Sequence, residues 1–254
     1  MRVFVTRPES EARRWVDELR QRGIDALSFP LIAIVPAAAG GPLRKAWQAL
    51  DGYRAVMFVS GNAVRQFFGQ RPADAAWPPQ TRAWATGGGT REALLEAGVG
   101  ASLVDSPPPQ SVQFDSETLW QQVARQVKPD DAVLIVRGGD VSGQASGRDW
   151  LADQLASAGA RVDTVVAYVR GIPDLDAGQL ALARSGATDG AWLLSSSQAI
   201  AHLQALLPAQ DWHAARAVAT HPRIAQAARR AGFGVVCESR PSVDAVVAAL
   251  ESFG

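Results

Sequence analysis

The chain has 254 residues, enough for one large domain or two smaller ones, and its 47% hydrophobic and 20% charged residues argue against a disordered protein. Its 25 Lys and Arg residues balance 25 Asp and Glu residues, which argues against a nucleic-acid-binding protein because such proteins usually carry a basic excess. A single cysteine, Cys237, cannot form an internal disulfide, which favours the reducing cytoplasm.

Short apolar runs alternate with helical patterns along the chain. The runs expected to be strands are 3–6, 26–34, 55–60, 82–86, 101–105, 132–138, 162–169, 190–196, 216–220 and 234–239. The helical patterns are 11–23, 62–70, 90–98, 116–127, 148–159, 198–207 and 223–232, with a last helix within 241–254. Several helical patterns end in Gly, which commonly follows the last helical turn. This alternation predicts an α/β fold, with parallel sheets that helices cover on both faces.

Neither a leader, a membrane span nor a metal site is expected. The N-terminal residues lack the long apolar stretch of a signal peptide, and no segment has the length of a membrane span. The three histidines, His202, His213 and His221, do not have metal-ligand spacing with Cys, Asp or Glu.

Three pairs of residues repeat at almost the same spacing. The pairs, 134 or 135 residues apart, are Gly98 with Gly232, Ser60 with Ser195, and Trp15 with Trp150. An internal duplication that produced two similar lobes would explain this spacing. The alternative is that strand–helix units resemble one another in any α/β chain.

The composition changes at 29–42 and at 167–178, where strand-like residues run into Pro- and Gly-rich connections. Dividing the chain there predicts a discontinuous lobe 1 of residues 1–35 and 173–254, a lobe 2 of residues 36–165, and a connector strand at 166–172. The chain then crosses between the lobes twice. We therefore expect a narrow hinge with a cleft between the lobes, a preferred place for a ligand.

Polar turns follow the predicted strands, and ligands of open α/β sheets bind beyond the carboxyl ends of the strands. The turns are VTRP (5–8), VSGN (59–62), ATGGGT (85–90), VRGGD (136–140), SSSQ (195–198) and ATHP (219–222). Each one alone is more often a plain helix cap than a ligand contact. Because helix N-termini attract anions, six such turns on the same side predict a polyanion site.

The turn at 85–90 has also the composition of a nucleotide loop. It has neither the G-x-G-x-x-G spacing nor a Walker lysine, and no acidic residue is evidently placed for a ribose. A nucleotide cofactor is therefore only weakly supported.

Four stretches, taken in order, carry a resemblance to a known family. They are VTRP before a helix, VSGNAV after an apolar strand, the segment 147–162, and VVAYVR at 165–170. Together they resemble uroporphyrinogen-III synthase along essentially the whole chain. The resemblance implies a two-lobed α/β enzyme whose lobes are joined by a two-stranded connector and whose first lobe is built from both chain ends.

The resemblance also implies a reaction. Enzymes of this family close hydroxymethylbilane, a linear tetrapyrrole with eight carboxylates, to uroporphyrinogen III in haem, sirohaem and cobalamin biosynthesis. The last pyrrole ring is inverted and water is lost, so the chain is expected to be a cyclising hydro-lyase without cofactor or metal. We further expect a cytoplasmic monomer that receives its substrate from hydroxymethylbilane synthase and binds neither nucleic acid nor membrane.

The resemblance assigns the catalytic role to Tyr168, one of only two tyrosines. Its phenol would help the leaving hydroxyl, since a phenol keeps its proton at neutral pH and can donate a hydrogen bond. We expect Tyr168 in the hinge, facing the cleft; from its position alone, a packed strand tyrosine is the favoured alternative. Tyr53 matches no motif and is expected to be structural.

The turns and the resemblance together assign substrate-binding residues, with the arginines as partners for acetate and propionate groups. Val59 and Leu194 stand where the family has a threonine before the serine. Ile224 stands where it has a helix-start threonine, so that contact is lost, or Thr220 or Arg223 replaces it. The assigned residues are Arg7, Ser60, Asn62, Thr86, Gly87, Thr90, Arg137, Gly138, Arg148, Ser195, Ser196, Thr220 and Arg223.

Two functions of other classes remain open at this point. One is a two-lobed binding protein that closes on an anionic small molecule without reacting, which would not need Tyr168. The other is a nucleotide-dependent α/β enzyme that uses the turn at 85–90.

Overall fold

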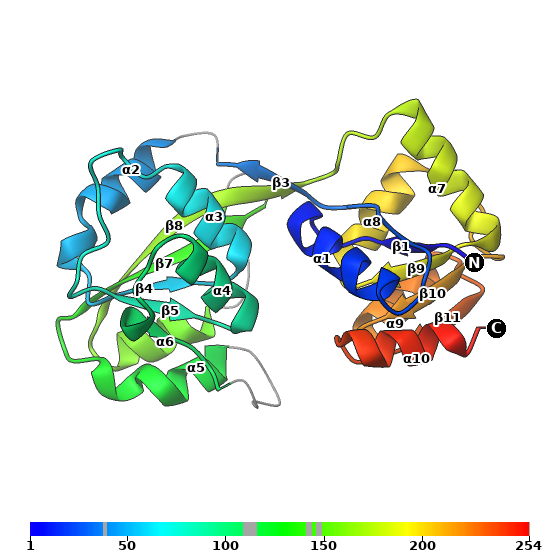
Figure 1. The fold of residues 1–254 in the computed structure, drawn as a ribbon. Helices are drawn as coiled ribbons and strands as arrows, with labels where there is room; N and C mark the ends of the chain where they lie inside the picture. The colour runs from blue at the N-terminus through cyan, green and yellow to red at the C-terminus, as the bar shows by residue number, and fades with distance from the viewer. Residues whose placement is uncertain (38–39, 109–115, 141–143, 146–148, 254) are drawn as a thin grey trace. The chain divides into compact units, whose positions relative to one another are not determined.

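The computed structural model describes residues 1–37, 40–108, 116–140, 144–145 and 149–253. Within it the chain forms two compact units: unit 1 is residues 1–33 with 171–254, and unit 2 is residues 34–170. Each unit is an α/β body with its own sheet and helices on both faces (Figure 1). The predicted fold of two similar α/β lobes is confirmed.

Unit 1 has a five-stranded sheet with strand order β11-β10-β9-β1-β2, and all four pairings are parallel. Its strands are β1 (Val3–Val5), β2 (Ala26–Ser28), β9 (Ala191–Leu194), β10 (Arg216–Ala219) and β11 (Val235–Glu238). Its helices are α1 (Glu9–Arg20), α7 (Ala177–Asp189), α8 (Ser197–Leu206), α9 (Pro222–Arg230) and α10 (Val243–Glu251).

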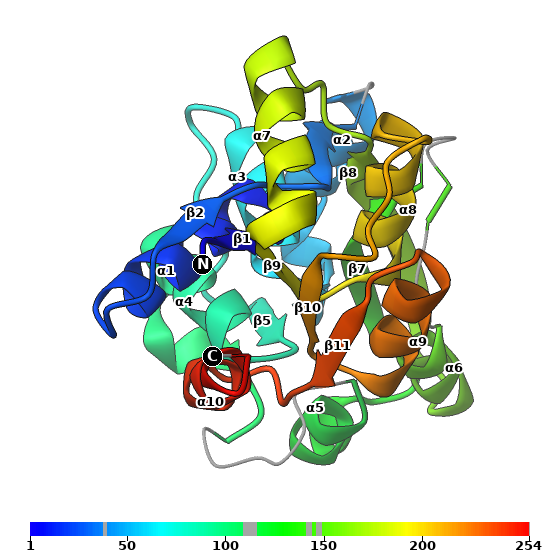
Figure 2. The same ribbon diagram turned by 90° about the vertical axis from the view of Figure 1, so that its right-hand side faces the viewer.

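The two faces of the unit 1 sheet are covered by different helices. Buried residues of α1 and α10 form one apolar cluster with Val3, Val5 and Leu193 of the strands. The other face carries Phe4 and Trp192, whose rings stack with centroids 4.5 Å apart. Helix α7 packs on this face, where the Trp192 indole donates a hydrogen bond to the carbonyl of Gly186. In Figure 2, α8 and α9 lie on that second side of the sheet.

Unit 2 has a six-stranded sheet with strand order β3-β8-β7-β4-β5-β6, in which β4 to β8 pair parallel. Its strands are β3 (Ala33–Pro36), β4 (Ala55–Phe58), β5 (Arg82–Ala85), β6 (Val104–Asp105), β7 (Ala132–Gly139) and β8 (Arg161–Gly171). Its α-helices are α2 (Gly40–Gln48), α3 (Gly61–Gly69), α4 (Gly88–Glu96), α5 (Ser116–Val123) and α6 (Trp150–Ser157), and short 3₁₀ helices lie at Leu50–Gly52, Ala101–Leu103 and Ala124–Gln126.

Alternating side chains of the unit 2 strands enter two cores. Val56 and Phe58 of β4 pack under α2, α3 and α4, whereas Ala55 and Met57 pack against α5 and α6. This alternation is the period of two that a strand imposes on its side chains. Figure 1 shows these two groups of helices on opposite faces of the sheet.

The two units share one strand order. Reading unit 2 from β6 through β5, β4 and β7 to β8 matches unit 1 from β11 through β10, β9 and β1 to β2. The one difference is that α5 connects β6 to β7, whereas no segment connects α10 to β1. The last strand–helix–strand of unit 1 is supplied by the start of the chain. The repeated residues follow this match, since Gly98 and Gly232 both take positive φ after corresponding helices α4 and α9.

Three boundaries differ from the sequence predictions. The single strand expected at 26–34 is two strands in different sheets, β2 and β3, because Pro30 between them has no N–H for a ladder. The strand expected at 101–105 is mostly a 3₁₀ helix, with β6 limited to two residues. Residues 166–169, expected in a connector, pair with β7 inside unit 2.

The N-terminus of α7 gives a test of local stability. Asp176 forms a capping box with Gln179, in which each side chain accepts a hydrogen bond from the backbone of the other residue. We expect Asp176→Ala to lower the free energy of unfolding by about 1 kcal/mol. Urea denaturation measures the loss. Ser242→Ala, at the start of α10, is the control, since the Ser242 side chain makes no capping bond and little change is expected.

Candidate functional site

A β-bulge brings Tyr168 over the carboxyl end of β7. Arg137 is opposite Val166, but Gly138 is opposite Tyr168, so β8 has one extra residue at this point. Val165, Ala167 and Tyr168 therefore all enter the same core cluster, although strand alternation would send Tyr168 to the other face. A Cβ on Gly138 would lie 2.6 Å from Cζ of the Tyr168 ring, so only glycine fits beneath it.

The Tyr168 hydroxyl contacts two side chains at the carboxyl edge of the unit 2 sheet. The Ser60 hydroxyl lies 3.1 Å from it, and Nη2 of Arg170 donates to it at 3.3 Å. The Arg170 guanidinium also lies 5.8 Å from the centre of the Tyr168 ring, within the range of a cation–π contact. A phenol, an alcohol and a cation thus form one cluster.

Tyr168 does not occupy the exposed hinge position that the sequence analysis expected. Its side chain is 0% exposed, since the bulge turns the ring into the core of unit 2. Ser60 and Arg170, which contact the phenol hydroxyl, are each partly exposed. The sequence analysis did not identify Arg170 as a candidate site residue. Its place two residues after Tyr168 could have indicated it, because side chains two apart in a strand point to the same side.

Ser60 also starts helix α3. Its hydroxyl accepts a hydrogen bond from the backbone N–H of Ala63 at 3.2 Å, the usual bond of an N-cap serine. Asn62 is buried, and its side-chain oxygen accepts from Arg65 at 2.9 Å. Ser60 thus faces the edge, whereas Asn62 is engaged within the helix.

The start of α4 lies at the end of the neighbouring strand β5. The Thr86 hydroxyl donates to the carbonyl of Val59, and Thr90 is buried in the first turn. The N-cap is Gly87, which has no side chain to bond the first amides of the helix, and Gly88 is exposed. The first turn of α4 therefore presents backbone N–H groups of the kind that bind anions.

Arg137 is buried at the end of β7. Its Nη1 donates to Asp149 at 2.5 Å, and the exposed fractions of the two side chains are 6% and 68%. A buried guanidinium paired to an exposed carboxylate keeps its charge close to the edge of the sheet. Arg148 lies outside the described residues.

In unit 1, the first strand ends at the edge with Thr6 and Arg7. The Thr6 hydroxyl donates to the carbonyl of Leu193 at 2.7 Å, which ties β1 to β9. The Arg7 guanidinium stacks 4.5 Å from the centre of the Trp15 ring and pairs with Glu11 at 3.3 Å. Burial lowers the pKa of Arg7, and the Glu11 carboxylate opposes that shift. Its Nε is buried without a hydrogen-bond partner among the described residues.

The other two turns of unit 1 follow β9 and β10. Ser195 and Thr220 are partly exposed, and the Ser196 hydroxyl caps α8 by accepting from the N–H of Gln198 at 3.2 Å. After β10, Nδ1 of His221 caps α9 by accepting from the backbone N–H of Arg223. In the first turn of α9, Ile224 is buried in the core, whereas the preceding Arg223 is exposed.

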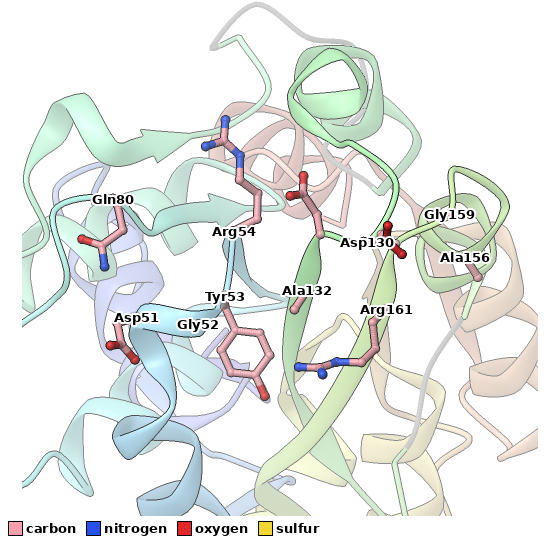
Figure 3. Close-up of a pocket in the computed structure, with 12 residues that line it drawn as sticks. Asp51, Gly52, Tyr53, Arg54, Gln80, Asp130, Ala132, Ala156, Gly159 and Arg161 are labelled. Carbon is pink, nitrogen blue, oxygen red and sulfur yellow. The ribbon is translucent and has the colours of Figure 1, made fainter.

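A separate open pocket of about 790 Å³ lies at the opposite, amino-terminal edge of the unit 2 sheet (Figure 3). Its lining mixes acidic residues such as Asp130 and Asp131 with Arg54 and Arg161. Tyr53 of this pocket donates to Asp163 at 2.9 Å, and burial together with that carboxylate raises its pKa to about 12. The mixed charge does not suit a polyanion, and the polar turns lie at the other edge.

The described residues offer neither a metal-binding cluster nor a membrane helix. Within the described ranges, His, Cys, Asp and Glu nowhere gather in a group of three that could hold a metal ion. The helices there are also too short or too polar to cross a membrane.

Comparisons with known proteins point to one family. A family model described as uroporphyrinogen-III synthase HemD matches residues 13–248. Porphyrin biosynthesis protein HemD of Ruminiclostridium josui is 28% identical over 137 residues, which are 53% of this chain and 26% of that protein. Uroporphyrinogen-III synthase of Chlorobaculum parvum is 36% identical over 104 residues, 38% of this chain and 39% of that protein. The matched segments thus span well under half the length of these relatives.

Solved structures share the fold over the whole chain. Uroporphyrinogen-III synthetase from Helicobacter pylori has a TM-score of 0.60 at 16% identity, with 100% of both chains covered. A mutant uroporphyrinogen III synthase from Thermus thermophilus has a TM-score of 0.54 at 18% identity, with 100% of this chain and 97% of that chain covered. At these identities the likeness concerns the fold alone.

Gly138 offers a test of the close approach between β7 and Tyr168. Because a Cβ there would overlap the ring, we expect Gly138→Ala to lower the free energy of unfolding by about 1–3 kcal/mol and to move the phenol. Chemical denaturation measures the loss. Gly100→Ala is the control, since a Cβ at Gly100 would meet nothing within 4 Å, and an equal loss in both variants would contradict the packing argument.

Tyr53 predicts a pH dependence of stability. Its pKa is raised above the ordinary value of 10.0 in the folded protein, so the protonated phenol stabilises the fold fully below about pH 10. This contribution is lost as the pH rises toward 12. In urea denaturation at a series of pH values, the parent protein should lose stability relative to Tyr53→Phe only above about pH 10. A constant difference across the range would contradict the assignment.

Proposed function

Because this chain belongs to the uroporphyrinogen-III synthase family, we propose that it closes hydroxymethylbilane to uroporphyrinogen III, inverting the last pyrrole ring and losing water. The observation that carries the proposal is the family match over residues 13–248, which includes the carboxyl ends of all the strands except β1. The activity belongs to tetrapyrrole biosynthesis.

The polar turns supply donors for a substrate with eight carboxylates. In unit 2 these are the amides at the start of α4 and the partly exposed Ser60. In unit 1 they are the partly exposed turns at Ser195 and Thr220, together with Arg223, whose exposed charge replaces the hydroxyl that Ile224 does not provide. Amides, hydroxyls and guanidinium groups all donate hydrogen bonds to carboxylates.

Asn62 and Thr86 have a different task in this proposal. Their side-chain oxygens are already engaged, with Arg65 and with the carbonyl of Val59, so they shape the turns rather than hold the substrate. Arg137, which is paired to Asp149, contributes positive charge at the edge.

In this reaction the protein needs only to hold the substrate and to assist the breaking of one bond. When the hydroxyl leaves the hydroxymethyl carbon, the remaining cation is stabilised by its own pyrrole ring. The protein must curl the chain so that the ends meet, help the oxygen to leave, and keep water from the cation. The cluster around Tyr168 supplies the assisting proton donor.

We place the reaction among cofactor-independent lyases. Nicotinamide chemistry is not called for, since the loss of water and the ring closure leave the oxidation state of the bilane unchanged. We also place the enzyme in the cytoplasm as a monomer that takes its substrate from hydroxymethylbilane synthase.

The direct test uses purified protein, freshly made hydroxymethylbilane and no added cofactor. We expect the type III isomer of uroporphyrinogen as the product, identified by chromatography after oxidation. Without the enzyme the bilane closes spontaneously to the type I isomer. Type I alone, in the presence of folded protein, would refute the proposed function.

Tyr168→Phe tests the proposed proton donor. The variant keeps the ring that fills the core and loses the hydroxyl, so we expect turnover to fall about 10²-fold with little change in KM. Steady-state kinetics measures both, and circular dichroism checks the fold. Tyr53→Phe, which loses a hydroxyl at the opposite edge of the sheet, is the matched control and should keep full turnover. Full turnover in Tyr168→Phe would remove the role.

A further inference from the structure

The contacts of the Tyr168 hydroxyl determine which group donates and which accepts in each of its hydrogen bonds. Its described partners are Ser60 and Arg170, and a guanidinium has no acceptor. Arg170 must therefore donate to the phenol oxygen. If Ser60 also donated, the phenol proton would be buried without an acceptor, which is unfavourable. The Tyr168 proton therefore points at the Ser60 oxygen.

The direction of the hydrogen bond from Tyr168 to Ser60 determines which bonds the Ser60 hydroxyl can still form. The Ser60 oxygen accepts from Tyr168 and from the backbone N–H of Ala63, and two bonds fill the acceptor sites of a hydroxyl. Its own proton is then the group left to donate. Ser60 is partly exposed whereas the Tyr168 side chain is 0% exposed, so a molecule at the edge meets the serine and not the phenol.

Arg170 provides the charge at the inner end of this chain. Among the described residues no carboxylate pairs with it, and its recorded contacts are the hydroxyl and the ring of Tyr168. Its N–H group donates to the phenol oxygen, and each bond in such a chain strengthens the next.

We propose that Ser60 is the catalytic residue that touches the leaving hydroxyl, and that Tyr168 and Arg170 are positioning residues that act through it as a directional proton relay. The proposal rests on the proposed function, which it deepens. It reassigns the role of Tyr168 from direct contact with the substrate to support of Ser60.

The step balances as follows. The bond between the hydroxymethyl carbon and oxygen breaks, and its electron pair stays on the oxygen. That oxygen takes the Ser60 proton and leaves as water, while Ser60 takes the Tyr168 proton. The phenolate charge is held beside Arg170. The cationic carbon then takes an electron pair from a carbon of the last pyrrole ring, and the new carbon–carbon bond closes the macrocycle. That ring carbon loses its proton, which returns through Ser60 to Tyr168.

A double-mutant cycle tests whether Ser60 and Tyr168 act in series. Ser60→Asn keeps a side-chain oxygen for the cap on Ala63 but removes the hydroxyl proton. We expect Ser60→Asn and Tyr168→Phe each to lower the single-turnover rate about 10²-fold, and the double variant to be within about 3-fold of the slower single variant. Losses that multiply in the double variant would overturn the relay.

Arg170 is tested by the split between kcat and KM. We expect Arg170→Gln to lower kcat about 10-fold at nearly constant KM, and Arg170→Lys, which keeps the charge, to recover part of the loss. A rise in KM at unchanged kcat would show instead that Arg170 binds a substrate carboxylate, and it would overturn the relay.

A solvent isotope measurement does not depend on whether the Ser60 variant folds. Two protons that move together give a curved dependence of the single-turnover rate on the deuterium fraction of the solvent, and we expect this curvature in the parent protein and its loss in Tyr168→Phe. A linear dependence in the parent would overturn the relay. Asp176→Ala, which removes a helix cap in unit 1, controls for lost stability and should keep the parent rate.

These outcomes are separate from the fate of the proposed function. If the parent protein makes no type III isomer, the function itself fails. If it makes the type III isomer and the variants behave additively, only the relay fails.

Discussion

Parallel strand pairing is the constraint on which the rest of this protein depends. Parallel strands need a crossover between them, and here the crossovers are helices that cover both faces of each sheet. The parallel strands of each sheet then have their carboxyl ends at one edge, where helices such as α3, α4, α8 and α9 begin. Because both faces are covered, this edge is where unbonded helix amides and short polar side chains meet a ligand. The position of the candidate site therefore follows from the sheet topology, whichever residues occupy it.

One extra residue in β8 determines which side chains meet at the carboxyl edge of the unit 2 sheet. A regular pairing would send the Tyr168 ring to the opposite face of the sheet, but the bulge at Gly138 turns it into the core under α3. The ring then carries the phenol oxygen up to Ser60, the residue that caps α3. The bulge in β8 and the cap of α3 thus bring a fully buried tyrosine into contact with a residue at the candidate site.

The matching strand orders show how the two units were built from one plan. Among the described residues, each unit has three helices on one face of its sheet and two on the other, and the central strands β4 and β9 each end in a serine-containing turn. The two units differ at the edge. Unit 2 keeps the buried Thr90 in the first turn of α4, whereas unit 1 has Ile224 in the core and an exposed Arg223. Unit 2 also holds the tyrosine cluster.

The amino-acid sequence by itself determined the alternation of strands and helices, the polar turns, the near-repeat of about 135 residues and the family, because these depend on local patterns of apolar and turn residues. It also singled out Ser60, Gly138 and Tyr168, though not their contacts. Only the tertiary structure decided that Tyr168 is buried, that Arg170 joins it, and that the strand at 26–34 divides between two sheets. The reason is that register and burial depend on strands brought together from distant parts of the chain: Ser60 and Tyr168 are 108 residues apart, and no local pattern records their contact.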